Sequence, residues 1–439
     1  MRPPYRRVIR WMLPGLNIKR WLMLAFVSMG CVVIAVLYAF GVDIAQMLHQ
    51  ALPLTRFESY IVTILLALLG FTGFALSLWR LVRSIARALA PRAAEKPSEL
   101  IFRQRVLERG PKIVALGGGT GLSTLLRGLK SLTSNITAVV TVMDDGGSSG
   151  RLRAEADSLP PGDARNCILA LADDEQELSE FFQHRFRSPD ALAGHALGNL
   201  LLVGLEQATG GFDRAIEAMS HFLNTHGTVL PATLQNTQLV ATMADGASII
   251  GESEIAADPR RIGRIALADG PVQPYDRVLR AIAEADLVLL GPGSLFTSLI
   301  PNLLVNGIAT AIESAPGEKL LIANLMTQPG ETDDLTLAGH LRSLNDYVMV
   351  SRFDGIIVNT APPSVDLLTI YRDEAAVPVL DDLQDGAEFS LEVFRVDLLG
   401  TARWAGKETL KHDPEKLAKA IALYADSFAG TRTISATSD

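Results

Sequence analysis

The stretch that decides the fold is residues 112–123, KIVALGGGTGLS, where a short apolar run ends in three glycines and a helical pattern follows. Similar apolar runs recur at 136–143 (ITAVVTVM), 285–291 (ADLVLLG), 319–325 (KLLIANL) and 354–359 (DGIIVN). Runs that are apolar on both faces and rich in Val and Ile are typical of buried parallel strands. Helical segments separate them, at 122–132, 197–209, 212–225 and 275–284. This alternation predicts a doubly wound, mostly parallel, Rossmann-like α/β sheet with helices on both faces.

The loop that follows the first predicted strand is rich in glycine. In sheets of this kind ligands bind at the carboxyl ends of the strands. Gly117 to Ser123 offers successive backbone N–H groups ahead of a helix, an arrangement that binds phosphate. It is not a Walker A loop, because no Gly-Lys-Ser/Thr follows, and Leu122 stands where a dinucleotide fingerprint has its third glycine. A tight turn without a ligand is the alternative.

A second polar loop, residues 143–153 (MDDGGSSGRLR), follows the second strand. Asp144 falls where dinucleotide-binding folds place the acid that holds a ribose. Asp145 beside it is a candidate Mg²⁺ ligand through water, because hard cations prefer oxygen. Arg151 is a candidate anion ligand. A solvated turn with capping serines is the alternative interpretation.

Further polar groups gather in four later segments. PPGDARNC (160–167) and GHALGN (194–199) each open a helix, and Asp163 is also a candidate N-cap. His195 is as readily structural as functional. GPGSLFTS (291–298) repeats the phosphate-binding pattern of the first loop, and NLMTQPGETDD (324–334) follows another strand. Together these loops predict a nucleotide-type ligand at the point where the strand order reverses.

Composition limits the function classes. The chain has 439 residues and a formal net charge of −8, with 48% hydrophobic but only 20% charged residues, below the quarter or so that is usual in soluble domains. Residues 1–96 carry 12 Lys and Arg against three acidic residues, and the remainder has a net charge of −17. An acidic body argues against a nucleic-acid partner. The two cysteines exclude a disulfide framework.

The N-terminal region predicts a membrane hairpin. Residues 21–42 and 60–79 are uncharged and apolar, and each is long enough to cross a bilayer as a helix. Six basic residues precede the first run and four closely follow the second, whereas the connecting loop has only Arg56. Because positive charge stays on the cytoplasmic side, we expect two spans in the cytoplasmic membrane with both termini in the cytoplasm.

The predicted divisions of the chain follow from these patterns. They are a basic N-terminus (1–20), two transmembrane helices (21–42 and 60–79), a basic juxtamembrane helix and linker (80–110), a ligand-binding α/β domain (111–428) and a flexible tail (429–439). The basic helix suits contact with anionic lipid. The apolar run 299–308 is either core or the interface of a homo-oligomer.

Six segments in consistent order closely resemble the gluconeogenesis factor family, the YvcK-like bacterial proteins grouped with 2-phospho-L-lactate transferase (CofD). They are GGGTGLSTLLRGLK, ITAVVTVMDDGGSSGRLR, PPGDARNCILALA, GHALGNLLL, GPGSLFTSLIPNLLV and NLMTQPGETDD. The resemblance covers about Pro111 to Phe428. The hairpin is not part of the family's minimal form, so the chain resembles a membrane-anchored version.

The resemblance implies a function. Family members bind UDP-sugars, notably UDP-N-acetylglucosamine, and are linked to cell shape, peptidoglycan synthesis and growth on gluconeogenic carbon, with no established reaction. Cell-wall synthesis proteins are therefore expected partners. It also implies that Tyr371 and the segment 411–414 complete the sugar side of the site. The related transferase uses Mg²⁺ and a guanosine diphosphate-linked donor, but residues 146–150 (GGSSG) depart from its pattern.

Two principal functions remain open at this stage: a membrane-tethered UDP-sugar sensor, and a Mg²⁺-dependent transferase. A third, an NAD-dependent oxidoreductase, lacks the glycine needed at position 122. No catalytic residue is assigned, and Asp144 and Asp145 are the only metal-ligand candidates. The predicted ligand-binding residues are Gly117, Gly118, Gly119, Thr120, Gly121, Ser123, Asp144, Asp145, Ser148, Ser149, Arg151, Asp163, Asn166, His195, Asn199, Gly291, Gly293, Ser294, Asn324 and Tyr371.

Overall fold

The computed structural model describes residues 18–40, 56–89, 105–187, 192–384, 388–404 and 407–435. The chain divides into two compact units, Met1–Arg105 and Val106–Asp439, which are treated separately. Most of the predicted basic N-terminus, residues 90–104 of the predicted linker and the last four residues of the predicted tail lie outside the described residues.

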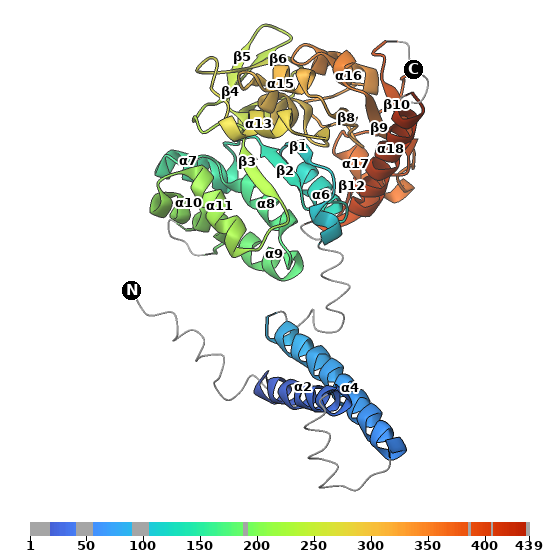
Figure 1. Ribbon diagram of the computed structural model, residues 1–439. Coiled ribbons are helices and arrows are strands. Elements are labelled where there is room, and N and C mark those ends of the chain that lie inside the picture. The colour runs from blue at the N-terminus through green and yellow to red at the C-terminus, as the bar shows by residue number, and fades with distance from the viewer. Residues whose placement is uncertain are drawn as a thin grey trace. The chain divides into compact units, whose positions relative to one another are not determined.

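The second unit is built on a seven-stranded sheet in the order β10-β9-β8-β7-β1-β2-β3 (Figure 1). All pairings in it are parallel. The strands are β1 (Ile113–Gly117), β2 (Ile136–Val140), β3 (Thr228–Pro231), β7 (Leu287–Leu290), β8 (Glu318–Ile322), β9 (Gly355–Asn359) and β10 (Glu392–Val396). The five strands predicted from the sequence are therefore confirmed, and so is the doubly wound α/β class.

Helices cover both faces of the sheet because successive strand residues point to opposite sides. Val114 and Leu116 of β1 belong to the core on one face, and Ile113 and Ala115 to the core on the other. The first face carries α13 (Asp276–Ala283), α14 (Ile300–Leu304), α15 (Ile308–Ser314) and α16 (Leu337–Asn345). The second carries α6 (Gly119–Leu129), α8 (Gly162–Leu171), α11 (Phe212–Phe222) and α18 (Pro414–Ser435). The other helices are α7 (Gly147–Ala156), α9 (Glu175–Gln183), α10 (Leu197–Thr209), α12 (Glu252–Ala257) and α17 (Val365–Asp373).

The strand order reverses between β1 and β7. From β1 the chain builds outward through β2 to β3, and it then returns to place β7 on the other side of β1. The loops after β1 and β7 therefore diverge from one point, which is where doubly wound sheets form a ligand crevice. The apolar run 299–308, open between core and interface from the sequence, lies in the core, with Ile300 and Ile308 fully buried.

Two smaller sheets were not predicted. An antiparallel sheet, β5-β4-β6, consists of Ser248–Ile250, Leu239–Met243 and Ile262–Leu267. A hairpin pairs β11 (Leu399–Trp404) with β12 (Lys407–His412). Their strands alternate between buried and exposed residues or are short, so they lack the continuous apolar runs that marked the main sheet.

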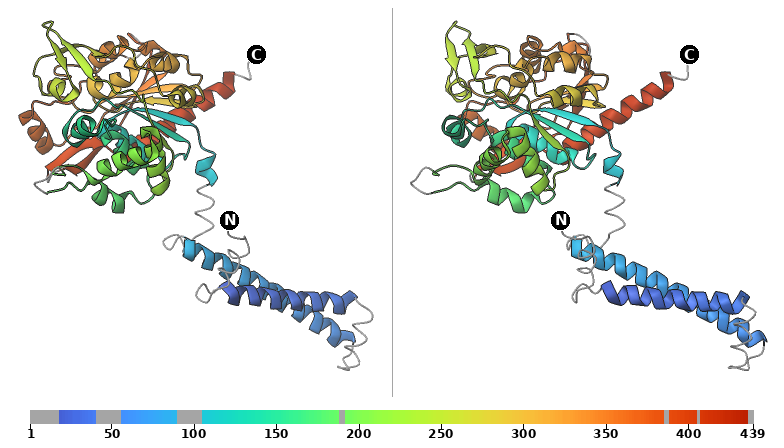
Figure 2. Two further views of the ribbon diagram at one scale, coloured as in Figure 1. Left: turned by 90° about the vertical axis from the view of Figure 1, so that its left-hand side faces the viewer. Right: turned by 60° about the vertical axis from the view of Figure 1, so that its left-hand side comes forward.

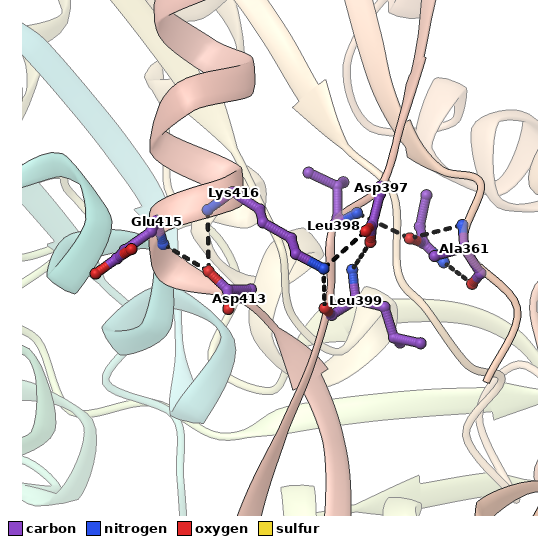
Figure 3. A network of polar contacts seen from close by, with 8 residues as sticks. Ala361, Asp397, Leu398, Leu399, Asp413, Glu415 and Lys416 are labelled. Atoms are coloured by element: carbon purple, nitrogen blue, oxygen red, sulfur yellow. Dashed lines mark hydrogen bonds and ion pairs between the residues drawn. The ribbon is translucent and has the colours of Figure 1, made fainter. Parts of the chain in front are cut away.

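A polar network attaches the start of α18 to the β11–β12 hairpin (Figure 3). The carboxylate of Asp413 accepts backbone N–H groups of Glu415 and Lys416, capping the helix. The ammonium of Lys416 reaches Asp397 at 2.7 Å and the carbonyl of Leu399 at 2.9 Å. The helix continues to Ser435, past the boundary at residue 428 that we expected for a flexible tail (Figure 2).

The first unit is a pair of long apolar helices in contact, α2 (Ile18–Phe40) and α4 (Arg56–Leu89). Within the described residues two stretches are long and apolar enough to cross a membrane, Arg20–Leu37 and Tyr60–Leu81. Small residues let the helices approach: a Cβ at Gly73 would lie 2.5 Å from the Ser28 hydroxyl. Large apolar side chains point outward, and Phe26 is 80% exposed. This outward apolar surface suits a lipid environment.

Arginines and tryptophans gather at one end of the pair. The guanidinium of Arg80 lies 5.2 Å from the Trp21 ring and 5.5 Å from the Trp79 ring, and that of Arg83 lies 5.2 Å from Trp79. Such cation–π contacts are typical of a membrane–water interface, where tryptophan and arginine anchor a span.

The close packing of Gly121 against Pro292 gives a prediction about the stability of the fold. A Cβ at Gly121 would lie 2.3 Å from the carbonyl oxygen of Pro292, because the first turn of α6 packs directly on the loop after β7. We expect Gly121→Ala to lower the free energy of unfolding by about 1–3 kcal/mol, the usual effect of overpacking. Gly204→Ala in α10, where a Cβ would meet nothing within 4 Å, is the control and should be neutral or stabilising. Equal thermal midpoints for the two variants would contradict the prediction.

Candidate functional site

Two cavities adjoin at the carboxyl ends of the central strands. The Tyr371 cavity, about 380 Å³, is lined by Gly118–Gly121, by the loops after β7 and β8, and by Tyr371 and Leu410. The Arg165 cavity, about 450 Å³, is lined by the first turns of α6, α7 and α8 together with Arg165, Arg185 and Asn199. Gly119, Thr120 and Lys411 line both. The start of α6 is therefore a wall that the two cavities share.

The glycine loop after β1 turns sharply into α6. Gly119 has φ +60°, a left-handed conformation that favours glycine, and a Cβ there would meet nothing within 4 Å. A Cβ at Gly118 would lie 2.7 Å from the Asp163 carboxylate. This first turn lines the cavities, as the sequence suggested for an anion-binding loop, although the Asp163 carboxylate lies against Gly118 and Gly119.

Asp163 is held against this loop. One of its carboxylate oxygens accepts the backbone N–H of Gly119 at 2.7 Å. Burial, together with the nearby charge of Asp144, raises its pKa to about 6, against the lowering effects of the Gly119 hydrogen bond and the charge of Arg165. Asp163 belongs to the first turn of α8, and its side chain binds the first turn of α6.

Arg165 lines the second cavity and is 8% exposed. Its two terminal nitrogens donate to the side-chain oxygens of Asn199 at 2.7 Å and Asn166 at 2.9 Å. Its Nε–H has no hydrogen-bond partner among the described residues. Burial, followed by the nearby positive charge of Arg185, lowers its pKa to about 10.

The two neighbouring aspartates after β2 have different surroundings. Asp144 lines the Arg165 cavity, accepts the N–H of Gly146 at 2.8 Å, and has its pKa raised chiefly by burial. Asp145 instead accepts the backbone N–H groups of Glu252 and Ser253, at 3.0 and 2.8 Å, at the start of α12. Burial, with the charges of Asp144 and Asp145, raises the pKa of Glu252 to about 8.

Ser148 and Asn199 line the Arg165 cavity, whereas His195 lies behind it. The Ser148 hydroxyl lies 3.1 Å from Nδ1 of His195 and accepts from Nδ2 of Asn199 at 3.0 Å. His195 is 1% exposed, and burial lowers its pKa. The geometry therefore gives His195 a supporting position behind the wall of the cavity.

The loop after β7 is held by polar side chains from the next strand's loop. The amide of Asn324 bonds to both backbone groups of Gly293, accepting its N–H at 3.2 Å and donating to its carbonyl at 2.8 Å. Gln328 donates to the Ser294 hydroxyl at 2.7 Å. Asn324 thus fixes the loop that faces Gly121, in addition to lining the Tyr371 cavity.

Tyr371 reaches the cavity from α17. Its hydroxyl accepts the backbone N–H of Leu410 at 2.9 Å, which positions the strand that carries Lys411. Burial and the nearby charge of Arg127 lower the pKa of Lys411.

Most of the predicted site residues line the two cavities. The exceptions are Gly117, Asp145, Arg151, His195 and Gly291. The guanidinium of Arg151 donates to the carbonyl of Ala193 at 2.6 Å and so lies apart. Sequence reasoning missed Arg127, Gln183 and Arg185, which also line the Arg165 cavity. Arg127 lies in α6 within the segment GGGTGLSTLLRGLK, where it was not singled out, whereas Gln183 of α9 and Arg185 after it lie outside every motif.

Comparisons with known proteins agree with this geometry. Residues 113–399 match the family model described as 2-phospho-L-lactate transferase CofD. A Nostoc sp. protein named "Putative gluconeogenesis factor" is 43% identical over 425 residues, 94% of this chain and 91% of that protein. The gluconeogenesis factor of Bacillus subtilis is 44% identical over 311 residues, 71% of this chain and 97% of that protein.

The chain belongs to the CofD/UPF0052 gluconeogenesis factor family. The crystal structure of protein BH3568 from Bacillus halodurans, 43% identical, superposes with a TM-score of 0.68 and covers 72% of this chain and 100% of that one. Relative to such shorter family members, this chain has an extra N-terminal region of about 120 residues with the two long apolar helices.

The CofD-type transferase raises the question of Mg²⁺. Both carboxylate oxygens of Asp145 are engaged by α12, which leaves Asp144 as the one member of the pair that faces the cavity. Among the described residues no group of three or more His, Cys, Asp or Glu has the geometry to hold a metal. The residues present do not fit a resident Mg²⁺, and we derive no step through one.

Asp163 gives a second prediction for this gluconeogenesis-factor-type site. Its pKa is raised from 3.8 in a free chain to about 6, so the folded protein loses stability as pH rises from about 4 to 7. Asparagine keeps an acceptor for Gly119 without a charge. At 1.36 kcal/mol per pKa unit, we expect Asp163→Asn to be more stable than wild type by about 3 kcal/mol at pH 8 and by about half that at pH 5.

Urea unfolding of the full chain at the two pH values checks this. Asp373→Asn, on an exposed part of α17, is the matched control and should show no comparable dependence. A stability difference for Asp163→Asn that does not grow with pH would rule out a buried, charge-destabilised carboxylate.

Proposed function

We propose that the protein is a membrane-anchored binding protein for a UDP-sugar, with UDP-N-acetylglucosamine as the ligand. The observation that carries the proposal is the first turn of α6, Gly119–Gly121, which lines the Tyr371 cavity at the point where the strand order reverses. Helix N-termini of this kind bind phosphate. In our proposal the diphosphate lies on this turn, and the uridine and sugar occupy the Tyr371 cavity.

The lining of the Tyr371 cavity supports a ligand of this type. Leu325, Met326 and Leu410 supply apolar contacts, and Asn324, Thr327 and Gln328 supply polar groups. A mixed lining with a few fixed polar groups is typical of small-molecule sites. Lys411, which reaches both cavities, adds a cation next to the proposed diphosphate position.

We further propose that ligand occupancy regulates cell shape, peptidoglycan synthesis and growth on gluconeogenic carbon, through cell-wall synthesis proteins. UDP-N-acetylglucosamine is a peptidoglycan precursor, so a protein that binds it can report precursor supply. The membrane hairpin would hold the ligand-binding domain at the cytoplasmic membrane, where we expect the cell-wall synthesis proteins to be.

A Mg²⁺-dependent transferase of the 2-phospho-L-lactate type is the second candidate function, favoured by the CofD family match over residues 113–399. A transferase of this type requires a nucleoside-diphosphate-linked donor in the position that we propose for the UDP-sugar. The engagement of Asp145 by α12 weakens it.

Calorimetric titration of the full chain in detergent with UDP-N-acetylglucosamine tests the proposal, with GDP and Mg²⁺ as separate arms. We expect Mg²⁺-independent binding of the UDP-sugar. We expect Gly119→Ala to weaken it about tenfold or more, because the new methyl group enters the space above the α6 turn. No heat with the UDP-sugar, or preference for GDP with Mg²⁺, would overturn the sensor proposal.

Gly307→Ala is a closely matched control for this variant. Gly307 also has a left-handed φ, +79°, and a Cβ there would also meet nothing within 4 Å, but it lies at the start of α15 and outside both cavities. Both substitutions therefore carry the same kind of backbone strain. Only Gly119→Ala should change the affinity for the UDP-sugar.

We also propose that both termini are cytoplasmic, because basic residues flank the outer ends of the two apolar helices. Single-cysteine variants on a Cys31→Ser, Cys167→Ala background test this with a membrane-impermeant maleimide on spheroplasts. We expect Met47→Cys, in the loop between the spans, to be labelled from outside and Thr437→Cys to be labelled only after lysis. Labelling of Thr437→Cys in intact spheroplasts would show that the C-terminus lies outside the cell and would contradict the proposed topology.

A further inference from the structure

The Arg165 cavity carries more positive than negative charge. Its lining includes Arg127, Arg165, Arg185 and Lys411, against the carboxylates of Asp144 and Asp163. Arg127 is in addition paired with the carboxylate of Glu175, at 2.5 Å. Two of these cations lie near another cation: Arg185 lowers the pKa of Arg165, and Arg127 lowers that of Lys411, in each case in addition to burial. Like charges that face one concave space are stabilised by an anion placed between them.

Four helices begin at this cavity. Its lining takes in residues of the first turns of α6, α7, α8 and α10, which are 11, 10, 10 and 13 residues long. These helices lie on the same side of the sheet, and α8 contacts α6 and α10 (Figure 1). In none of the four does the N-cap side chain accept a hydrogen bond from the first turn. The positive ends of their dipoles add to the arginine charges.

A separate observation points to a missing partner. Arg165 is more than nine-tenths buried, and its two terminal nitrogens are held by Asn199 and Asn166. The carbon chain of Arg165 packs against Gly198, where an added Cβ would lie 2.6 Å from its Cδ. The side chain is thus fixed, yet its Nε–H has no partner among the described residues. An unpaired buried donor costs about 1–3 kcal/mol, so an acceptor that reached this N–H would stabilise the folded protein.

We infer that the Arg165 cavity is a second binding site, for a small molecule that carries a phosphate group, next to the site proposed for the UDP-sugar. The assignment rests on the proposed function in one respect only, that the UDP-sugar occupies the Tyr371 cavity. A phosphate group suits the cavity because its oxygens can accept from several guanidiniums and helix N-termini at once. The protein would then bind two ligands, on either side of the first turn of α6.

Inorganic phosphate is the probe for this site. Full-length protein in detergent, at constant ionic strength, is titrated with phosphate up to about 20 mM while its thermal midpoint is followed, since a ligand that binds the folded state raises it. We expect a saturable rise in the midpoint. Titration with UDP-N-acetylglucosamine at increasing phosphate should show a weakening of its affinity that levels off once the phosphate site is filled, because two anions that share the wall of Gly119, Thr120 and Lys411 repel each other but do not exclude each other.

Arg185 provides the test variant, because it lines the Arg165 cavity and not the Tyr371 cavity. Arg185→Gln should weaken the phosphate effect about tenfold or more and leave UDP-sugar affinity unchanged. Arg187→Gln, two residues along on an exposed position, removes the same charge outside the cavity and should behave as wild type. Arg127→Gln on α6 is a second test if Arg185→Gln does not fold, since Arg185 also donates to the carbonyl of Gly194.

Three results would overturn the inference. They are the absence of a saturable phosphate effect, an equal loss in Arg185→Gln and Arg187→Gln, and competition, in which the affinity for the UDP-sugar keeps falling in proportion to phosphate and does not level off. Competition would mean that the diphosphate of the UDP-sugar itself binds in the Arg165 cavity. If the UDP-sugar itself fails to bind, the proposed function falls, but the phosphate effect and its loss in Arg185→Gln are still measured independently.

Discussion

The contact between the first turn of α6 and the loop after β7 is the constraint on which the rest of the site depends. Gly121 lies against the carbonyl of Pro292, and no larger residue fits between them. The contact exists because β1 and β7 are neighbours with connections that run in opposite directions. Asn324 then clamps the second loop through Gly293, so that three consecutive strand ends are joined by short polar contacts. The Tyr371 cavity opens from this junction, and it shares Gly119 and Thr120 of the first turn of α6 with the Arg165 cavity.

The central sheet was predictable from the sequence because its strands are buried on both faces and therefore uniformly apolar. The glycine loops were predictable for the same reason, since they stand where such runs end. The β4–β6 sheet and the β11–β12 hairpin were not, because strands that mix buried residues with the half-buried Val240 and the exposed Thr242 give weak patterns. Their placement depends on tertiary contacts that a local pattern does not contain.

The site was predictable in its loops but not in the direction of its side chains. Asp144 and Asp145 are adjacent, yet one faces a cavity and the other caps a helix more than a hundred residues further on. Arg185, which lines the cavity, follows α9 in a segment without any motif. Spacing alone cannot separate such cases, because a side chain's direction is set by which distant N–H or carboxylate it meets.

The close packing of Ser28 against Gly73 in the apolar helix pair has a consequence for how the chain unfolds. In lipid these helices gain nothing from burying apolar surface, because the surrounding hydrocarbon is as apolar as their side chains. The α/β unit, by contrast, is held by apolar burial in water, which urea and heat weaken. In the membrane-anchored protein that we propose, denaturation should therefore be a two-stage process, in which the α/β unit unfolds while the helix pair stays in the lipid. An unfolded body that remains tethered in this way cannot diffuse from the membrane, and its refolding begins from a fixed N-terminal end.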